Sequence, residues 1–94
     1  MSKSTERPFA RSPDAKLKRV GQGMAVYIPD QKAIHVLNST AQLLFELLAE
    51  PTTASELVEA LVYATDGDPE IIAADVRKTL DDFSDKGLIV EAQA

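Results

Sequence analysis

The sequence predicts a small α+β domain, winged-helix-like in outline, with a three-stranded antiparallel sheet followed by three α-helices. Two observations predict this class. Apolar residues alternate with a period of two in the first part of the chain, and they recur with helical spacing in the second part. Strands that precede helices, with short connections between them, favour helices packed on one face of the sheet. The chain has 94 residues, of which 45% are hydrophobic and 27% charged, which suffices for one domain with one core.

Alternating apolar residues predict the sheet. Residues 24–28 place their larger aliphatic side chains on one face, which is typical of a half-buried strand. Residues 29–32 begin with Pro-Asp, which favours a turn, and alternation resumes over Ala33–Leu37, so a hairpin is expected. A further strand over Lys16–Val20 is predicted, because residues 21–23 contain two glycines that permit a tight reversal. Two strands alone would be marginally stable, so we expect three.

Helical spacing begins after the last predicted strand. Asn38 is a favoured N-cap residue, and the apolar stripe after it predicts a first helix over residues 39–49. The stripe, at i, i+3, i+4 and i+7, consists of Ala41, Leu44, Phe45 and Leu48. Thr53 and Glu56 have the spacing of a capping box, which predicts a second helix over residues 54–64.

The third helix is predicted to begin at Pro69, because Asp68 can cap it and proline has the φ angle of a first helical position. It is expected to end before Gly87, since glycine commonly adopts the left-handed conformation that ends a helix. Its apolar stripe consists of Ile72, Val76, Leu80 and Phe83. A short apolar segment over residues 88–90 closes the chain.

The charge is unevenly distributed along the chain. The net charge is −5: residues 1–22 hold six basic and two acidic residues (+4), and residues 23–94 hold four basic and thirteen acidic residues (−9). Residues 1–15 are predicted to form a flexible basic N-terminal tail, since they contain too little apolar surface to offset the entropy of ordering. Such a tail either promotes solubility or attracts an acidic partner. The folded domain is expected over residues 16–92.

Composition excludes several classes of protein. Without cysteine the chain has no disulfide, thiolate nucleophile or zinc finger. No apolar run approaches the roughly 20 residues that span a bilayer, and no secretory signal is visible, so a cytoplasmic protein is expected. His35, the only histidine, lacks further metal ligands and is interpreted as a strand-surface residue. No nucleophile motif or phosphate loop is found, so we expect no catalytic residues, no metal site and no cofactor.

Several segments together resemble the PqqD-like family of peptide-binding domains, also called RiPP recognition elements after the ribosomally made, modified peptides that they handle. The segments are the Leu37-Asn38 step into a helix, the Thr53 to Leu57 start of the next helix, the Asp75-Val76 pair with Leu80, and Lys86 to Ile89. The resemblance covers about residues 17–91. It implies a non-catalytic chaperone or adaptor that binds the leader of a precursor peptide and presents it to a modifying enzyme, often a radical-SAM protein. Family members that serve pyrroloquinoline quinone biosynthesis carry a tryptophan in the second strand, and this chain has none.

The resemblance also implies where the peptide binds: between the edge strand Ala33–Leu37 and the third helix. An uncovered strand offers unpaired N–H and C=O groups that an extended peptide can satisfy. The candidate peptide-binding residues are Ala33, Ile34, His35, Val36, Leu37, Asp75, Lys78, Thr79, Asp82 and Lys86. Helical spacing puts Asp75, Thr79, Asp82 and Lys86 on one flank of the third helix. The alternative is an ordinary solvated face in which an Asp82–Lys86 pair contributes only a few tenths of a kcal/mol.

Two other functions compete with peptide binding. A winged-helix DNA-binding regulator shares the outline, but its recognition helix would here carry more acidic than basic residues and repel phosphate. The carboxylates are Asp75, Asp81, Asp82 and Asp85, against Arg77, Lys78 and Lys86. A general protein–protein interaction module is the other alternative. We therefore expect a leader peptide and a modifying enzyme as partners, no nucleic acid and no membrane, and a possible homodimer through the edge strand.

Overall fold

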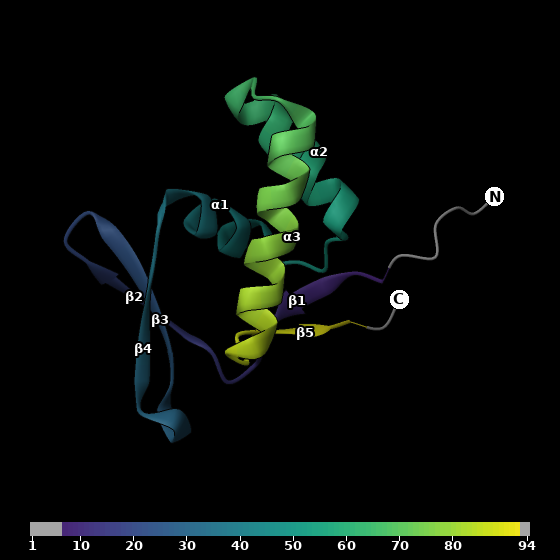
Figure 1. The fold of residues 1–94 in the computed structure, drawn as a ribbon. Helices are drawn as coiled ribbons and strands as arrows, with labels where there is room; N and C mark the ends of the chain where they lie inside the picture. Colours follow the sequence, from purple (N-terminus) through teal and green to yellow (C-terminus); the bar gives the residue numbers. More distant parts are fainter. Residues whose placement is uncertain (1–6, 93–94) are drawn as a thin grey trace.

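The computed structural model describes residues 7–92, which form two antiparallel sheets and three α-helices (Figure 1). The three-stranded sheet has the order β2-β3-β4, with β2 over Lys16–Val20, β3 over Gly23–Ile28 and β4 over Ala33–Leu37. The helices are α1 over Ser39–Leu47, α2 over Ala54–Thr65 and α3 over Pro69–Asp85. Strands β1 over Phe9–Arg11 and β5 over Ile89–Glu91 form the second sheet. The predicted α+β class, with three strands followed by three helices, is confirmed.

The turns between strands form as their residue types predict. Gly21 has φ +59°, a left-handed conformation that glycine adopts without steric cost, and it reverses the chain between β2 and β3. Between β3 and β4 a 3₁₀ turn, η1 (Pro29–Gln31), is followed by Lys32 at φ 57°. A helical turn that ends in one left-handed residue is a common hairpin connection.

Each predicted helix cap is present. The Asn38 Oδ1 atom accepts a hydrogen bond from the Ala41 N–H at 2.8 Å. Thr53 and Glu56 form the reciprocal capping box at the start of α2. α3 begins at Pro69 with the Asp68 side chain as its cap, and Gly87 follows its end with φ +75°. These local interactions explain why the sequence predicts the helices to within about two residues.

One core joins the three-stranded sheet to the helices. The buried face of the sheet contributes Met24, Val26, Ile28 and Leu37. The helices contribute Ala41, Leu44, Phe45, Leu48, Leu57, Leu61, Val76, Leu80 and Phe83, and the closing segment adds Leu88 and Ile89. The aromatic rings of Phe45 and Phe83 meet edge to face with their centroids 5.8 Å apart. This contact holds α1 against α3. Along residues 7–92, no helix has the length and apolarity needed to cross a membrane.

Strand β1 lies within the segment that the sequence predicts to be a flexible tail, so the prediction is corrected for residues 9–11; residues 1–6 lie outside the described part of the chain. Phe9 exchanges backbone hydrogen bonds of 2.8 and 2.9 Å with Thr52, and Arg11 pairs with Ile89 of β5. The Arg11 guanidinium lies 4.7 Å from the Phe45 ring centroid, and its Nε donates to the Phe45 carbonyl at 2.8 Å. These partners are distant in sequence, so the local composition of residues 1–15 does not reveal them.

The contacts of Arg11 predict that β1 contributes to stability. Replacing Arg11 with Met keeps most of the apolar stem but removes the guanidinium. The free energy of unfolding, measured with urea, should therefore fall by about 1–2 kcal/mol. Arg7→Met is the matched control, because Arg7 makes only an exposed contact of 3.8 Å with Glu91 and should change stability by less than about 0.5 kcal/mol. Equal effects of the two substitutions would contradict a structural role for β1.

Candidate functional site

The three-stranded sheet has two outer strands with very different protection. β3 lies in the centre, so β2 and β4 each have one side that pairs with no strand of residues 7–92. β2 carries Lys16, Lys18 and Arg19, and such charges discourage pairing with another chain. β4 reads Ala-Ile-His-Val-Leu and carries no Lys, Arg, Asp or Glu. β4 is therefore the edge that is open to a further strand.

The register of β4 gives its two faces different surroundings. Val36 pairs with Ala25, and Ile34 pairs with Tyr27, on one face of the sheet. Their exposed fractions are 74% and 65%, which is high for aliphatic residues. Leu37 pairs with Met24 on the opposite face and is buried in the core. A strand added beside β4 would thus meet apolar side chains on the outer face and the helices on the inner face.

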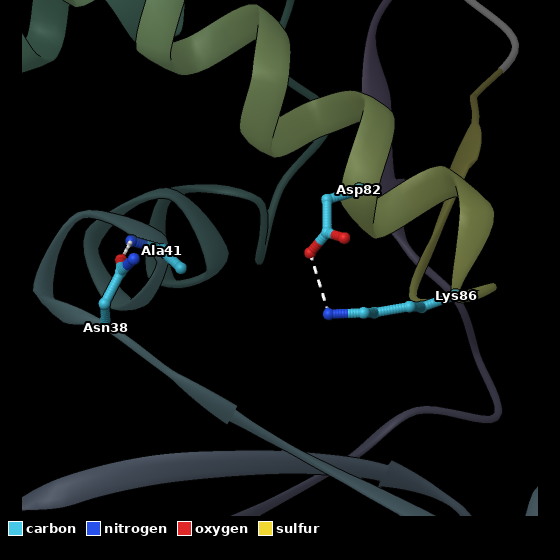
Figure 2. Close-up of polar contacts among 4 residues, drawn as sticks. All are labelled: Asn38, Ala41, Asp82 and Lys86. Atoms are coloured by element: carbon cyan, nitrogen blue, oxygen red, sulfur yellow. Dashed lines mark hydrogen bonds and ion pairs between the residues drawn. The ribbon is translucent and has the colours of Figure 1, made fainter.

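A groove of about 640 Å³ lies between the end of β4, the start of α1 and the C-terminal half of α3. β4 and α1 contribute Val36, Leu37, Asn38, Thr40 and Ala41. The polar rim on α3 consists of Asp75, Lys78, Thr79, Asp81, Asp82, Asp85 and Lys86, and the apolar Phe83 and Leu88 also line the groove. Figure 2 shows the Asp82 and Lys86 side chains projecting from α3 toward the α1 side.

The structure brings most of the predicted site residues together at this groove. Those that line it are Val36, Leu37, Asp75, Lys78, Thr79, Asp82 and Lys86. Ala33, Ile34 and His35 belong to the same edge strand but do not line the groove; Ile34 faces outward, as its pairing with Tyr27 shows. Whether any of these residues contacts a peptide stays a prediction.

Sequence reasoning missed part of the rim. Asp81 and Asp85 are not among the predicted peptide-binding residues, but both line the groove, as do Asn38, Thr40 and Ala41. Helical spacing contains the signal for Asp85, since it lies three residues after Asp82 and one before Lys86. The contribution of α1 follows from the abrupt step from β4 through Asn38 into the helix, which keeps the first turn of α1 beside the edge strand.

The comparisons with known proteins agree with this geometry. The sequence model of the family described as Coenzyme PQQ synthesis protein D (PqqD) matches residues 23–89, from β3 to the start of β5. The chain belongs to the PqqD family. The predicted resemblance is confirmed, and the PqqD match includes both β4 and α3, the two walls of the groove.

Two solved structures share the PqqD fold of this chain. One is described as TbiB1 in complex with the TbiA(beta) leader peptide; it has a TM-score of 0.78 and 16% identity, over 90% of this chain and 99% of the other. The second is described as lasso peptide synthetase B1 complexed with the leader peptide; it has a TM-score of 0.77 and 16% identity, over 87% of this chain and 96% of the other. No curated protein sequence matches the chain.

The groove of this PqqD domain is negatively charged. Its lining contains four aspartates and two lysines, a net charge of −2. The Lys86 Nζ lies 2.9 Å from the Asp82 Oδ2 in an i, i+4 pair whose side chains are about half exposed, so the pair contributes only a few tenths of a kcal/mol. Asp75, Asp81 and Asp85 have no ion-pair partner among residues 7–92.

Three of the four aspartates in the groove lie at the end of α3 where the helix dipole disfavours negative charge. The C-terminal end of α3 carries a partial negative charge, which favours basic residues there. Instead the last turn of α3 contains no basic residue, and three of the final five positions of the helix are aspartates: Asp81, Asp82 and Asp85. Asp81 and Asp85 are also a like-charged i, i+4 pair, which is unfavourable by a few tenths of a kcal/mol. The sequence here has not been optimised for helix stability.

The groove lacks the composition of a metal site or of a closed pocket. No group of three potential ligands among residues 7–92 could hold a metal ion. A second hollow of about 460 Å³ lies between α2 and α3, with Phe9, Val58 and Leu80 in its lining. It has no open strand edge, because β1 is paired with β5 and, at Phe9, with Thr52. The groove beside β4 is the better candidate for an extended ligand.

The charge at the end of α3 predicts that stability can be increased there. Asp85→Lys removes like-charge repulsion and complements the helix dipole, so the free energy of unfolding should rise by roughly 0.5–1 kcal/mol at low salt. Glu70→Lys makes the same charge change in the first turn of α3, where an acidic residue is favourable, and should lower stability by a similar amount. Thermal unfolding of both variants at low and high salt measures the difference. Shifts in the same direction would contradict the role of the dipole.

Proposed function

We propose that this domain binds the leader of a ribosomally made precursor peptide by strand addition along β4. The observation that carries the proposal is the contrast between the two edges of the sheet: β2 is protected by basic residues, whereas β4 is uncharged and borders the groove. The two similar structures described above each contain a leader peptide, which supports the same use of the shared fold.

Strand addition fits the distribution of polar and apolar groups at this edge. The unpaired N–H and C=O groups of β4 would supply affinity without regard to sequence, because every peptide has a backbone. Alternate side chains of the leader would point into the groove, where Leu37 and Phe83 are apolar and the α3 rim is polar. The side chains between them would point outward, next to Ile34. Specificity would therefore come from two separate sets of side chains.

The proposed role is that of a non-catalytic chaperone or adaptor that presents the leader to a modifying enzyme, of the radical-SAM or another type. The titratable groups that line the groove are aspartates and lysines, and this set does not pair a nucleophile with a general base. We place this step in the cytoplasm, where a precursor is made, and leave open whether the pathway is pyrroloquinoline quinone biosynthesis or another one. The β4 edge also fits a second copy of the chain, and such a homodimer would compete with the leader for the same backbone groups.

A DNA-binding regulator is disfavoured by the charge of α3. This helix presents four aspartates to the groove and would repel phosphate groups. A general protein interaction module also fits the fold, but it does not explain why β4 lacks the charges that protect β2.

The proposal predicts where a leader peptide perturbs the domain. In a heteronuclear NMR titration with synthetic leaders from short reading frames near the gene, saturable shifts should concentrate in residues 33–38 and 75–86. Strand addition buries backbone amides of β4, so their hydrogen exchange should slow in the complex. Titration with duplex DNA should give no saturable shifts. Binding to DNA, or to none of the peptides, would overturn the proposal.

A charge on the open edge should weaken binding. Val36→Lys gives β4 the type of protection that β2 already has, and loss of one cross-strand apolar contact corresponds to a roughly threefold to tenfold higher Kd. Val36 is exposed, so folding should be unaffected. Val20→Lys, on the other edge strand, is the matched control and should leave the Kd unchanged. If both substitutions had the same effect, the peptide would not bind along β4.

A further inference from the structure

We propose that the leader segment beside β4 carries a lysine or arginine at a position that faces the groove. This inference rests on the proposed function and defines the chemistry of the peptide that the site selects. Two features of the groove support it: an apolar floor beneath an acidic rim, and an acidic helix end where, among residues 7–92, Asp82 has an ion-pair partner but Asp81 and Asp85 have none.

The floor and the rim together match a long basic side chain. Val36, which is 74% exposed, supplies accessible apolar surface in the groove lining, and the almost fully buried Leu37, Phe83 and Leu88 complete its apolar part. The carboxylates of Asp75, Asp82 and Asp85 belong to exposed residues in the same lining, along one flank of α3. Lysine and arginine lay their aliphatic stems on apolar surface while the charged head stays near water and counter-charges. Neither an aliphatic nor an acidic side chain would use both parts of this groove.

The lysines of the groove do not provide an equivalent site for an acidic leader residue. Lys86 already pairs with Asp82, as Figure 2 shows. Lys78 is the other basic residue in the lining, and it is outnumbered by the carboxylates. The local field therefore favours a cation from the ligand over an anion.

The position of the carboxylates is the independent reason to expect a cationic ligand. Asp81, Asp82 and Asp85 lie at the end of α3 that favours positive charge, and among residues 7–92 the one ion pair they form is that of Asp82 with Lys86. Residues that weaken the fold locally tend to be kept where function requires them. A cation bound between β4 and α3 would compensate both the repulsion among these groups and the helix dipole.

The period of a strand gives the inference a stringent test. Adjacent residues of an added strand point to opposite faces, so moving the basic residue by one position transfers its head from the groove to the outer face. The test uses the synthetic leader that saturates the domain in the NMR titration. Three peptides are compared by calorimetry: the native leader, a variant with its groove-facing Lys or Arg replaced by Gln, and a variant in which that residue is exchanged with its neighbour.

The replacement should raise the Kd by roughly fivefold to tenfold, the strength of a charge-assisted contact in a partly exposed site. The exchange, which preserves net charge and composition, should raise it by a similar factor. Asp85→Lys should weaken binding of the native leader and strengthen binding of a leader with Glu at that position. Glu70→Lys, with the same charge change on the same helix but outside the groove, should do neither.

The outcomes separate this inference from the proposed function. A leader that binds along β4 but keeps its Kd after the replacement and the exchange would overturn the cationic specificity alone. Equal effects of Asp85→Lys and Glu70→Lys would also overturn it, because the attraction would then reflect only the net charge of the domain. Absence of binding by every leader would overturn the proposed function and this inference together.

Discussion

The arrangement of the groove depends on the side chain of Phe45. Its ring is fully buried, it meets Phe83 of α3 edge to face, and the Arg11 guanidinium of β1 lies over it. Three elements that are distant in sequence therefore meet at one residue of α1. Because α1 follows β4 after only Asn38, the same contact sets how close α3 lies to the edge strand. The groove therefore lies where the packing of the core brings α1, α3 and the edge strand together.

The core explains the position of the groove, but the composition of the strands explains which of the two outer strands we propose as the binding edge. β2 and β4 pair with the same central strand, in the same antiparallel way, and both have a free side. The backbone alone would make them equivalent. Basic side chains on β2 make approach of another strand unfavourable, and their absence from β4 leaves that edge available. The two outer strands therefore differ in how strongly they discourage pairing, although the backbone treats them alike.

The sequence predicts the elements of this fold well because their signals are local. Asn38, the Thr53–Glu56 box and Asp68 cap the helices that they were expected to cap. The β1–β5 pair was missed because it joins the two ends of the described chain, and short strands without a turn between them leave no periodic signal. At the site, helical spacing identifies one flank of α3 but not the width of the groove. Whether Asp81 and Asp85 line the groove depends on how α3 packs on α1, which spacing within one helix does not show.

The end of α3 illustrates how stability and function are separated in this domain. Phe83 and Leu80 face the core and obey the apolar spacing of the helix, whereas Asp81, Asp82 and Asp85 lie on its exposed side. The buried residues fix where the helix lies, so the exposed positions can carry unfavourable charge without altering its course. The cost is confined to a few surface interactions, each of them small. Selection at those positions can therefore follow the chemistry of the ligand, while the core maintains the fold.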